Sequence, residues 1–367
     1  MTANLDLPPI VELEDSLDAV IDFFETQGWT DGLPFLPPTR QRLDEMYTYV
    51  DRAPEDVVAT LAPRNGEATV ERIAINAVMA GCRPEYLPVL ITAAEAVAEE
   101  AFNLNGIQST THPCGVLVLL NGPVGRELNV NSGYNCFGQG WRANATIGRA
   151  MRLILQNIGG GTPGEGDRST HGSPAKFSFC AAENEAENPW EPLHVEQGFD
   201  LEDSTVTVMA CEAPHNVNDH ASVSGQGLLT TVGRAMRQPG SNNMSSDGGQ
   251  PLVVFGPEHA EAIAKDGLSK EDAKRQLWEY SRLALEDLAS DWVDVRTAAA
   301  PEGTTVPPQL QVAEHWSRIN VIVAGGAGKH SCWMPTFGRS GMTDTVTRRI
   351  ERADGTPVRS VYDVGSD

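Results

Sequence analysis

Two segments of this 367-residue chain match each other closely enough to indicate an internal repeat. The first lies near residues 116–156 and the second near residues 205–237. Each has an apolar run that ends at a proline, then Asn-Val-Asn, then Gly-Gln-Gly, and finally TIGRAMR in the first copy or TVGRAMR in the second. The last blocks agree at six of seven positions, and Asn-Val-Asn stands equally far from Gly-Gln-Gly in both copies. The repeat therefore predicts two copies of one strand–loop–helix unit and a core of the α/β class.

The polar loop of each copy predicts a binding site. Asparagine offers hydrogen-bond donors and acceptors and tolerates left-handed turns. Glycine lets the backbone approach a ligand closely, and the helix start that follows is suited to binding an anion. We therefore expect substrate to be bound in one pocket formed by both copies, by Asn129, Asn131, Asn216 and Asn218. The alternative is that these loops and glycines only form tight corners between strand and helix.

The remaining pattern also favours an α/β fold. Short apolar runs predict buried strands at 115–121, 204–211, 251–255 and 319–324. Helical periodicity is found at 14–28, 39–60, 69–81, 84–101 and 257–289, and a loop rich in proline and glycine at 298–312. We expect a mixed or mostly parallel sheet with flanking helices. The predicted regions are a helical and proline-rich N-terminal region (1–66), a duplicated core (67–245) and a C-terminal α/β portion (246–367), or a single domain containing all three.

The charge of the chain argues against several classes of partner. The formal net charge is −23 at pH 7, so we expect neither a nucleic acid nor an anionic membrane as a partner. The N-terminus lacks a basic start with an apolar run, and no stretch reaches the about 20 apolar residues of a membrane span. The six cysteines form no C-x-x-C pair, which favours free thiols in a reducing compartment. These features predict a cytoplasmic protein.

The segment after the second repeat strand concentrates reactive side chains. CEAPHNVNDH (211–220) holds a thiol, two imidazoles and two carboxylates within ten residues. Ligands of α/β proteins bind at strand ends, so we expect His215, Asp219 and His220 to transfer protons. The alternatives are metal binding by these side chains and purely structural hydrogen bonding.

A second candidate segment, GGAGKHSCW (325–333), follows the last predicted strand. It lacks the G-x-x-x-x-G-K-[ST] spacing of a phosphate loop, so the sequence argues against a nucleoside triphosphatase. Its backbone amides still suit an anion, with Lys329 and Ser331 as substrate-binding residues and His330 as a catalytic residue. A glycine turn beside a buried cysteine is the alternative.

Three residues outside these segments complete the candidate site. Arg142 and Arg149 lie near the first glycine loop and are the expected anion binders. Cys82 follows a predicted helix and is a candidate nucleophile, although small buried thiols are common. No cofactor motif is evident, and the sequence leaves open whether a metal is bound.

Several longer motifs resemble one known family. TDGLPFLPPT (30–39), ATVERIAINAVMAGCRPEYLPVL (68–90), GQGWRANATIGRA (138–150), FCAAENEAENPWEPLHVEQGF (179–199) and PHNVND (214–219) are similar to segments of poorly characterised bacterial proteins associated with a Sec-Gly-Ser-Cys (UGSC) motif. The resemblance covers roughly residues 28–350. It implies thiol or selenol redox chemistry on a small molecule. Because this chain has no Cys-Gly-Ser-Cys segment, such chemistry would require a thiol-redox partner protein.

These observations favour an enzyme that acts on a small polar or anionic metabolite. It would cleave or form a carbon–heteroatom bond by acid/base or thiol chemistry, as lyases and hydrolases do. A metal-dependent hydrolase or lyase with His, Asp and Glu ligands is the first alternative. A non-catalytic binding subunit of a thiol-redox partner is the second, and a homo-oligomer is compatible with each of these functions.

Overall fold

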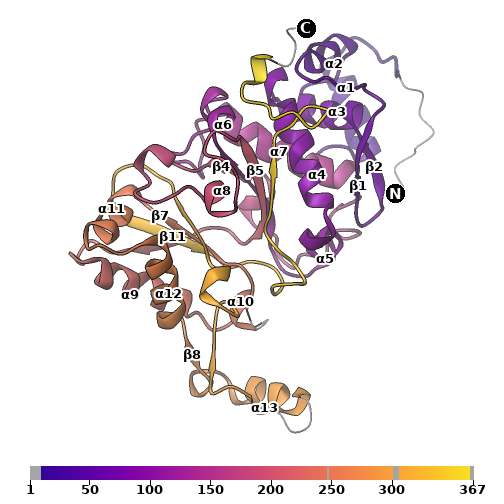
Figure 1. The fold of residues 1–367 in the computed structure, drawn as a ribbon. Coiled ribbons are helices and arrows are strands. Elements are labelled where there is room, and N and C mark those ends of the chain that lie inside the picture. Colours follow the sequence, from indigo (N-terminus) through magenta and orange to yellow (C-terminus); the bar gives the residue numbers. More distant parts are fainter. Residues whose placement is uncertain (1–9, 246–247, 301–305, 364–367) are drawn as a thin grey trace.

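Two four-stranded sheets form the centre of the molecule (Figure 1). A computed structural model of the chain describes residues 10–245, 248–300 and 306–363. The strand order of the first sheet is β12 (Val346–Arg349), β5 (Thr205–Cys211), β3 (Gly115–Asn121) and β4 (Cys180–Ala182). The strand order of the second sheet is β6 (His215–Asn218), β11 (His330–Met334), β7 (Leu252–Phe255) and β10 (Asn320–Val323).

The two sheets have the same topology. In the first, β3 runs parallel to β4 and antiparallel to β5, and β5 is antiparallel to β12. In the second, β7 runs parallel to β10 and antiparallel to β11, and β11 is antiparallel to β6. Both β3 and β7 lead through a Gly-Pro turn into a helix, which is α6 (Pro123–Glu127) or α11 (Pro257–Lys265). The duplication in this fold therefore relates β3 to β7.

Each sheet takes an edge strand from the other part of the chain. β6 directly follows β5 of the first sheet, but it pairs with β11 of the second. β12 follows β11 of the second sheet, but it pairs with β5 of the first. The two sheets therefore exchange edge strands, and neither four-stranded sheet is complete without a strand from the other part.

An apolar layer lies between the two sheets. Side chains alternate along a strand, so one face of each sheet contributes to this layer. Leu117, Leu119 and Met209 of the first sheet share one buried cluster with Val254 and Ile322 of the second. Helices cover the outer faces: α3 (Val70–Ala80), α4 (Leu87–Ala98) and α7 (Arg142–Asn157) on the first sheet, and α9 (Gly225–Met236), α11 and α12 (Lys270–Tyr280) on the second. The layers are thus helices, sheet, sheet and helices (Figure 1).

The remaining elements surround these layers. α1 (Leu17–Gln27), α2 (Arg40–Tyr47) and the hairpin of β1 (Val57–Leu61) and β2 (Gly66–Thr69) lie on the side of α3 and α4 (Figure 1). Short helices are α5 (Leu104–Ser109), α8 (Leu193–Glu196) and α10 (Asn242–Ser245). α13 (Ser290–Ala299) lies on a projecting arm whose base is the pair of β8 (Leu283–Ala284) and β9 (Gln309–Leu310) (Figure 1). No helix in the described part of the chain combines the length and apolar character that crossing a bilayer requires.

The predicted α/β class and its four apolar strands are confirmed. The runs at 115–121, 204–211, 251–255 and 319–324 correspond to β3, β5, β7 and β10, and both sheets are mixed. The exchange of edge strands joins the regions predicted at 67–245 and 246–367. Within the predicted loop at 298–312, residues 301–305 lie outside the described residues.

Two expectations from the sequence are corrected. Residues 39–60 are not one helix, because α2 ends at Tyr47 and β1 begins at Val57. Pro54 and the β-branched residues after it favour a turn and a strand there. Both matched segments do fold as an apolar strand, a polar segment and a helix, β3 to α7 and β5 to α9, but the strands are neighbours in one sheet whereas the helices cover different sheets. The fold is duplicated, but in a different alignment from the one that the sequence match indicates.

Replacing a residue of the inter-sheet layer should destabilise the protein strongly. Leu119 is fully buried between the sheets, whereas Leu201 is exposed. L119A should lower the free energy of unfolding by about 2–5 kcal/mol because it opens a cavity. The matched variant L201A should change it by less than about 0.5 kcal/mol. Urea denaturation followed by tryptophan fluorescence measures both, and equal effects would contradict a packed layer between the sheets.

Candidate functional site

Loops from both sheets meet near the carboxyl ends of β3, β4 and β10. A glycine loop (324–329) connects β10 to β11. At its start, Gly325 N–H donates a hydrogen bond to Ser132 O at 2.8 Å. At its end, Lys329 O accepts one from Asp219 N–H at 3.4 Å. The segments that follow both Asn-x-Asn motifs therefore reach the same glycine loop, at a strand end of the kind where α/β proteins bind ligands.

The ladder between β6 and β11 brings two histidines together. In its register Asn218 is paired with His330 and Asn216 with Cys332, so these side chains share one face of the second sheet. His330 Nδ1 lies 2.9 Å from Asn216 Oδ1, and His330 Nε2 lies 3.3 Å from His220 Nε2. The two rings are inclined at 80°, and both side chains are exposed. We call His220 and His330 the histidine pair.

The hydrogen bond to Asn216 determines where the hydrogens of the histidine pair lie. An amide oxygen only accepts, so His330 carries a hydrogen on Nδ1. In the neutral ring His330 Nε2 is then an acceptor, and the hydrogen between the two Nε2 atoms belongs to His220. Among the residues that the structure describes, none makes a hydrogen bond to His220 Nδ1. The pair thus presents a basic nitrogen to solvent, with a second acceptor behind it.

A buried hydrogen-bond chain supports β6 and β11 beneath the histidine pair. His259 of α11 is buried, with Nε2 3.1 Å from Asp219 O and Nδ1 2.8 Å from Ser331 Oγ. Because a carbonyl only accepts, His259 carries its hydrogen on Nε2, and the Ser331 hydroxyl donates to Nδ1. Burial lowers the pKa of His259, which keeps the ring neutral. Ser331 is therefore a buried structural residue and not the exposed anion ligand expected from the sequence.

Asp219 holds the turn that follows β6. Its Oδ1 accepts hydrogen bonds from the backbone of Ala221 at 3.1 Å and of Ser222 at 2.9 Å. Its Oδ2 accepts from the hydroxyls of Ser222 at 2.7 Å and Thr231 at 2.6 Å. Burial raises the pKa of Asp219, but these hydrogen bonds outweigh it and hold the pKa at about 2. An ionised and fully engaged carboxylate argues against the proton-transfer role expected from the sequence.

The predicted asparagines have different positions. Asn131 is buried and shapes its own loop, because its side chain donates to Tyr134 O at 2.8 Å and accepts from Gly133 N–H at 2.9 Å. Asn129 is exposed and adopts a left-handed conformation with φ of 54°. Asn218 is exposed beside His330. Of the four, Asn216 and Asn218 lie at the histidine pair, whereas the first two organise the loop of the first copy.

His215 and Lys329 lie near opposite ends of the β6–β11 ladder. His215 is exposed, but it pairs with Trp333 in the register and therefore lies on the opposite face of the sheet from His330. Lys329 directly precedes His330 and is partly exposed. His215 therefore does not join the histidine pair as the proton-transfer residue that the sequence predicts, whereas Lys329 lies beside the pair, and its predicted role in substrate binding stays a prediction.

Arg142, Arg149 and Cys82 lie where α7 packs against α3, on the outer side of the first sheet. Arg149 Nε and Nη2 donate to the carboxylate of Asp31 at 2.7 and 2.8 Å. Arg142 Nε donates to Gly81 O at 3.0 Å. The sequence predicted both arginines as anion binders of the site, but these guanidinium groups have structural partners and do not face the histidine pair.

All six thiols are free and are unsuited to nucleophilic attack in this structure. Burial raises the pKa of each of them, for Cys82 and Cys332 to about 12. A buried thiol with so high a pKa is protonated at neutral pH, and the thiolate is the reactive form. The candidate role of Cys82 as a nucleophile therefore finds no support in its environment.

Sequence reasoning missed His259 as a part of this region. Its signal in the sequence is weak, because it consists of a histidine two residues after the Gly-Pro turn that ends an apolar strand.

The sequence left open whether the protein binds a metal. Within the described ranges, no group of three His, Cys, Asp or Glu side chains is arranged to hold an ion.

No protein-family model, curated protein or solved structure matches this chain. The resemblance to the UGSC-associated proteins therefore stays a prediction from the sequence motifs.

Protonation of His259 should destabilise the fold at acidic pH. In the unfolded chain an imidazole has a pKa of about 6.5, and burial lowers that pKa in the folded state. The stability contributed by neutral His259 is thus present above about pH 6.5 and is lost as the pH falls. Urea denaturation should show a free energy of unfolding that decreases between about pH 7.5 and pH 5.5.

The variant H259Q is the matched control for this effect. It should be less stable than the wild type by about 1–3 kcal/mol at neutral pH, because Ser331 and Asp219 O lose a partner. Its further decrease at acidic pH should be smaller than that of the wild type. An identical decrease in both proteins would contradict a neutral, buried His259.

Proposed function

We propose that this protein is an enzyme that transfers protons to and from a small polar or anionic metabolite at the histidine pair, in a lyase or hydrolase type of reaction. The observation that carries this proposal is the distance of 3.3 Å between His220 Nε2 and His330 Nε2, with His330 oriented by Asn216. A histidine base whose ring is oriented by a further group is an arrangement that supports general acid/base catalysis.

The histidine pair can work as a relay. His220 Nδ1 accepts a proton from the substrate, and the hydrogen on His220 Nε2 moves to His330 Nε2. His220 is then neutral again, and His330 is an imidazolium. This cation keeps both of its hydrogen bonds, from Nδ1–H to Asn216 Oδ1 and from Nε2–H to His220 Nε2. The reverse transfer delivers a proton to a leaving group, so one pair serves as base and then as acid.

The surroundings of the histidine pair favour an anionic or polar substrate. The chain as a whole is acidic, with a net charge of −23. Beside the histidine pair, however, Lys329 adds a positive charge, and the adjacent carboxylate of Asp219 is buried and hydrogen-bonded to hydroxyl groups. Asn218 adds an exposed amide on the same face. A substrate carboxylate or phosphate would meet cationic and hydrogen-bonding groups here.

The same geometry favours a second candidate function, which is metal-assisted hydrolysis. Two nitrogen ligands at about 2.1 Å from one tetrahedral zinc ion lie about 3.4 Å apart, close to the distance between the two Nε2 atoms. An ion there would take the place of the shared hydrogen and supply Lewis-acid chemistry. The Nδ1–H of His330 on Asn216 Oδ1 is also the kind of contact that orients a histidine ligand.

Deuterium incorporation tests proton transfer before the substrate is known. Pools of small carboxylic and phosphorylated metabolites are incubated with the protein in D₂O, and mass spectrometry detects exchange or a new product. We expect the wild type to act on at least one compound. H330N should lower that rate by about 100-fold or more, because general acid/base catalysis contributes about 10²–10⁴-fold.

The variant H315N is the control, because it removes an exposed imidazole that bonds to Ser317 and lies outside the site. It should keep the wild-type rate. Wild-type rates in both H330N and H220N would show that the proposal is wrong. An activity that EDTA abolishes and zinc restores would favour the metal-assisted reaction, whereas an activity that EDTA leaves unchanged would favour the relay.

A further inference from the structure

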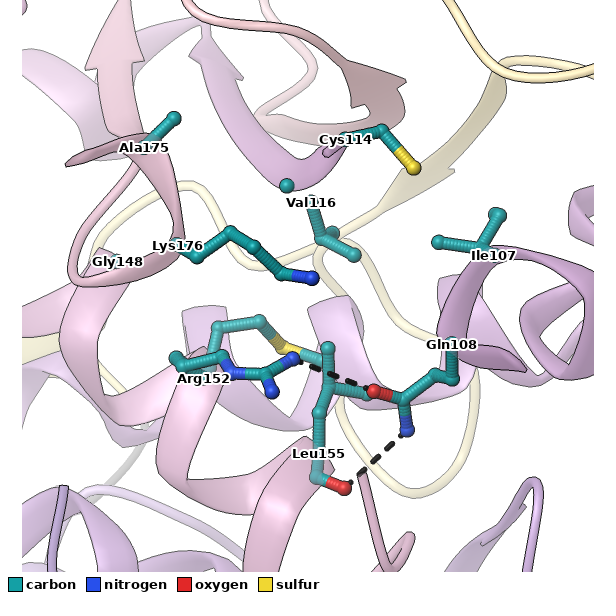
Figure 2. Close-up of a pocket in the computed structure, with 11 residues that line it drawn as sticks. Ile107, Gln108, Cys114, Val116, Gly148, Arg152, Leu155, Ala175 and Lys176 are labelled. Carbon is teal, nitrogen blue, oxygen red and sulfur yellow. Dashed lines mark hydrogen bonds between the residues drawn. The ribbon is translucent and has the colours of Figure 1, made fainter. Parts of the chain in front are cut away.

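A small hollow lies at the start of β3, at the opposite end of that strand from the glycine loop (Figure 2). It is bounded by β3, α5, α7 and the loop that leads into β4. The space that a water-sized sphere can occupy there is about 20 Å³, which is room for about one water molecule. Figure 2 shows the side chains of Gln108, Cys114, Arg152 and Lys176 directed toward this space.

The two cations of the hollow share one carboxylate. Arg152 Nη2 lies 2.8 Å from Asp167 Oδ2, and Lys176 Nζ lies 2.7 Å from the same oxygen. The side chains of Arg152, Lys176 and Asp167 are 15%, 13% and 7% exposed, so all three charges are largely removed from water. Gln108 Oε1 accepts a weak hydrogen bond from Arg152 at 3.4 Å, and Gln108 Nε2 donates to Leu155 O (Figure 2).

The cluster of Arg152, Lys176 and Asp167 carries a net charge of +1. Burial raises the pKa of Asp167, but Lys176, the backbone of Ser169 and Arg152 hold it below its ordinary value. The carboxylate is therefore ionised and neutralises one cation. Another carboxylate, Glu212, acts on Cys114 of the hollow, but it is engaged by His112 Nε2 at 2.7 Å and does not line the hollow. A buried charge without a counter-charge costs free energy that a bound anion would recover.

A long ordered loop holds these charges in place. Between the end of α7 at Asn157 and β4, the chain has one short 3₁₀ turn, at Pro174–Lys176. Gly164 N–H donates to Asp167 O at 2.8 Å, and Thr170 N–H donates to Thr111 O at 3.0 Å. Ordered loops of this length without a helix or strand of their own are usually functional.

We propose that this hollow binds a compact monovalent anion, either a halide or a carboxylate as small as formate, between Arg152 and Lys176. Lys176 supplies hydrogen bonds and the charge in excess over Asp167, and Arg152 supplies a directed guanidinium. Cys114 does not compete as an anion, because burial raises the pKa of its thiol to about 12. This site is separate from the histidine pair, and it does not depend on the proposed proton transfer.

Titration with bromide and with formate in a chloride-free buffer tests this site. Isothermal titration calorimetry should show saturable binding of at least one of the two anions to the wild-type protein. K176M removes the excess charge and leaves the neutral pair of Arg152 and Asp167, so the affinity should fall at least tenfold. K265M makes the same change at an exposed lysine and should bind like the wild type. Competition between formate and bromide would identify a site that also accepts carboxylates. Binding of bromide with no binding of formate would identify a site for halides.

Two results would overturn the proposal. One is the absence of saturable binding of both anions to the wild type, and the other is an equal loss of affinity in K176M and K265M, which would indicate a general salt effect. If K176M does not fold, anomalous diffraction from wild-type crystals soaked in bromide takes its place. A bromide peak beside Lys176 Nζ and Arg152 supports the site, and a hollow without a peak at saturating bromide contradicts it.

Discussion

The antiparallel ladder between β6 and β11 is the interaction on which the rest of this structure depends. β6 directly follows β5 of the first sheet in the chain, and its pairing with β11 completes the second sheet. In the same way, β12 follows β11 and completes the first sheet by pairing with β5. The exchange holds the sheets face to face over one apolar layer. The same ladder places Asn216 of one part of the chain beside His330 of the other, 114 positions apart. The pairing of β6 with β11 therefore both completes the fold and assembles the candidate site.

At the β6–β11 edge of the second sheet, buried polar groups have a structural role and exposed groups remain available for chemistry. Asp219, His259 and Ser331 use their hydrogen-bonding capacity to hold the backbone of β6 and β11 in place. The histidine pair remains exposed, and its ring orientation is set by Asn216. His330 lies on a strand, and His220 lies in the turn after β6 that Asp219 holds in place. Side chains supported in this way by satisfied polar groups are positioned more precisely than side chains on free loops.

Much of the fold could be predicted, because a strand buried on both faces is an apolar run in the sequence. β6 and β11 escaped prediction because their exposed residues are polar, and their pairing spans more than a hundred residues. One matched position of the repeat has a local reason in each helix: a Cβ at Gly148 would lie 2.4 Å from Phe179 N, and one at Gly233 2.6 Å from Tyr280 Cβ. Both helices need a glycine at a close contact, although they cover different sheets. Within the site, the correct segments were predicted, but the partners of Arg149 and Asp219 depend on tertiary contacts that no pattern shows.

The proposed relay depends most directly on the positions of the hydrogens in the histidine pair. Long-range ¹H–¹⁵N correlation spectra of the imidazole rings, assigned with H220N and H330N, report which nitrogen of each ring carries a hydrogen. In the neutral state we predict that His330 carries it on Nδ1 and His220 on Nε2, as the contact with Asn216 requires. A hydrogen on Nε2 of His330, or rapid averaging of both rings as in free imidazole, would contradict a fixed pair and the relay built on it.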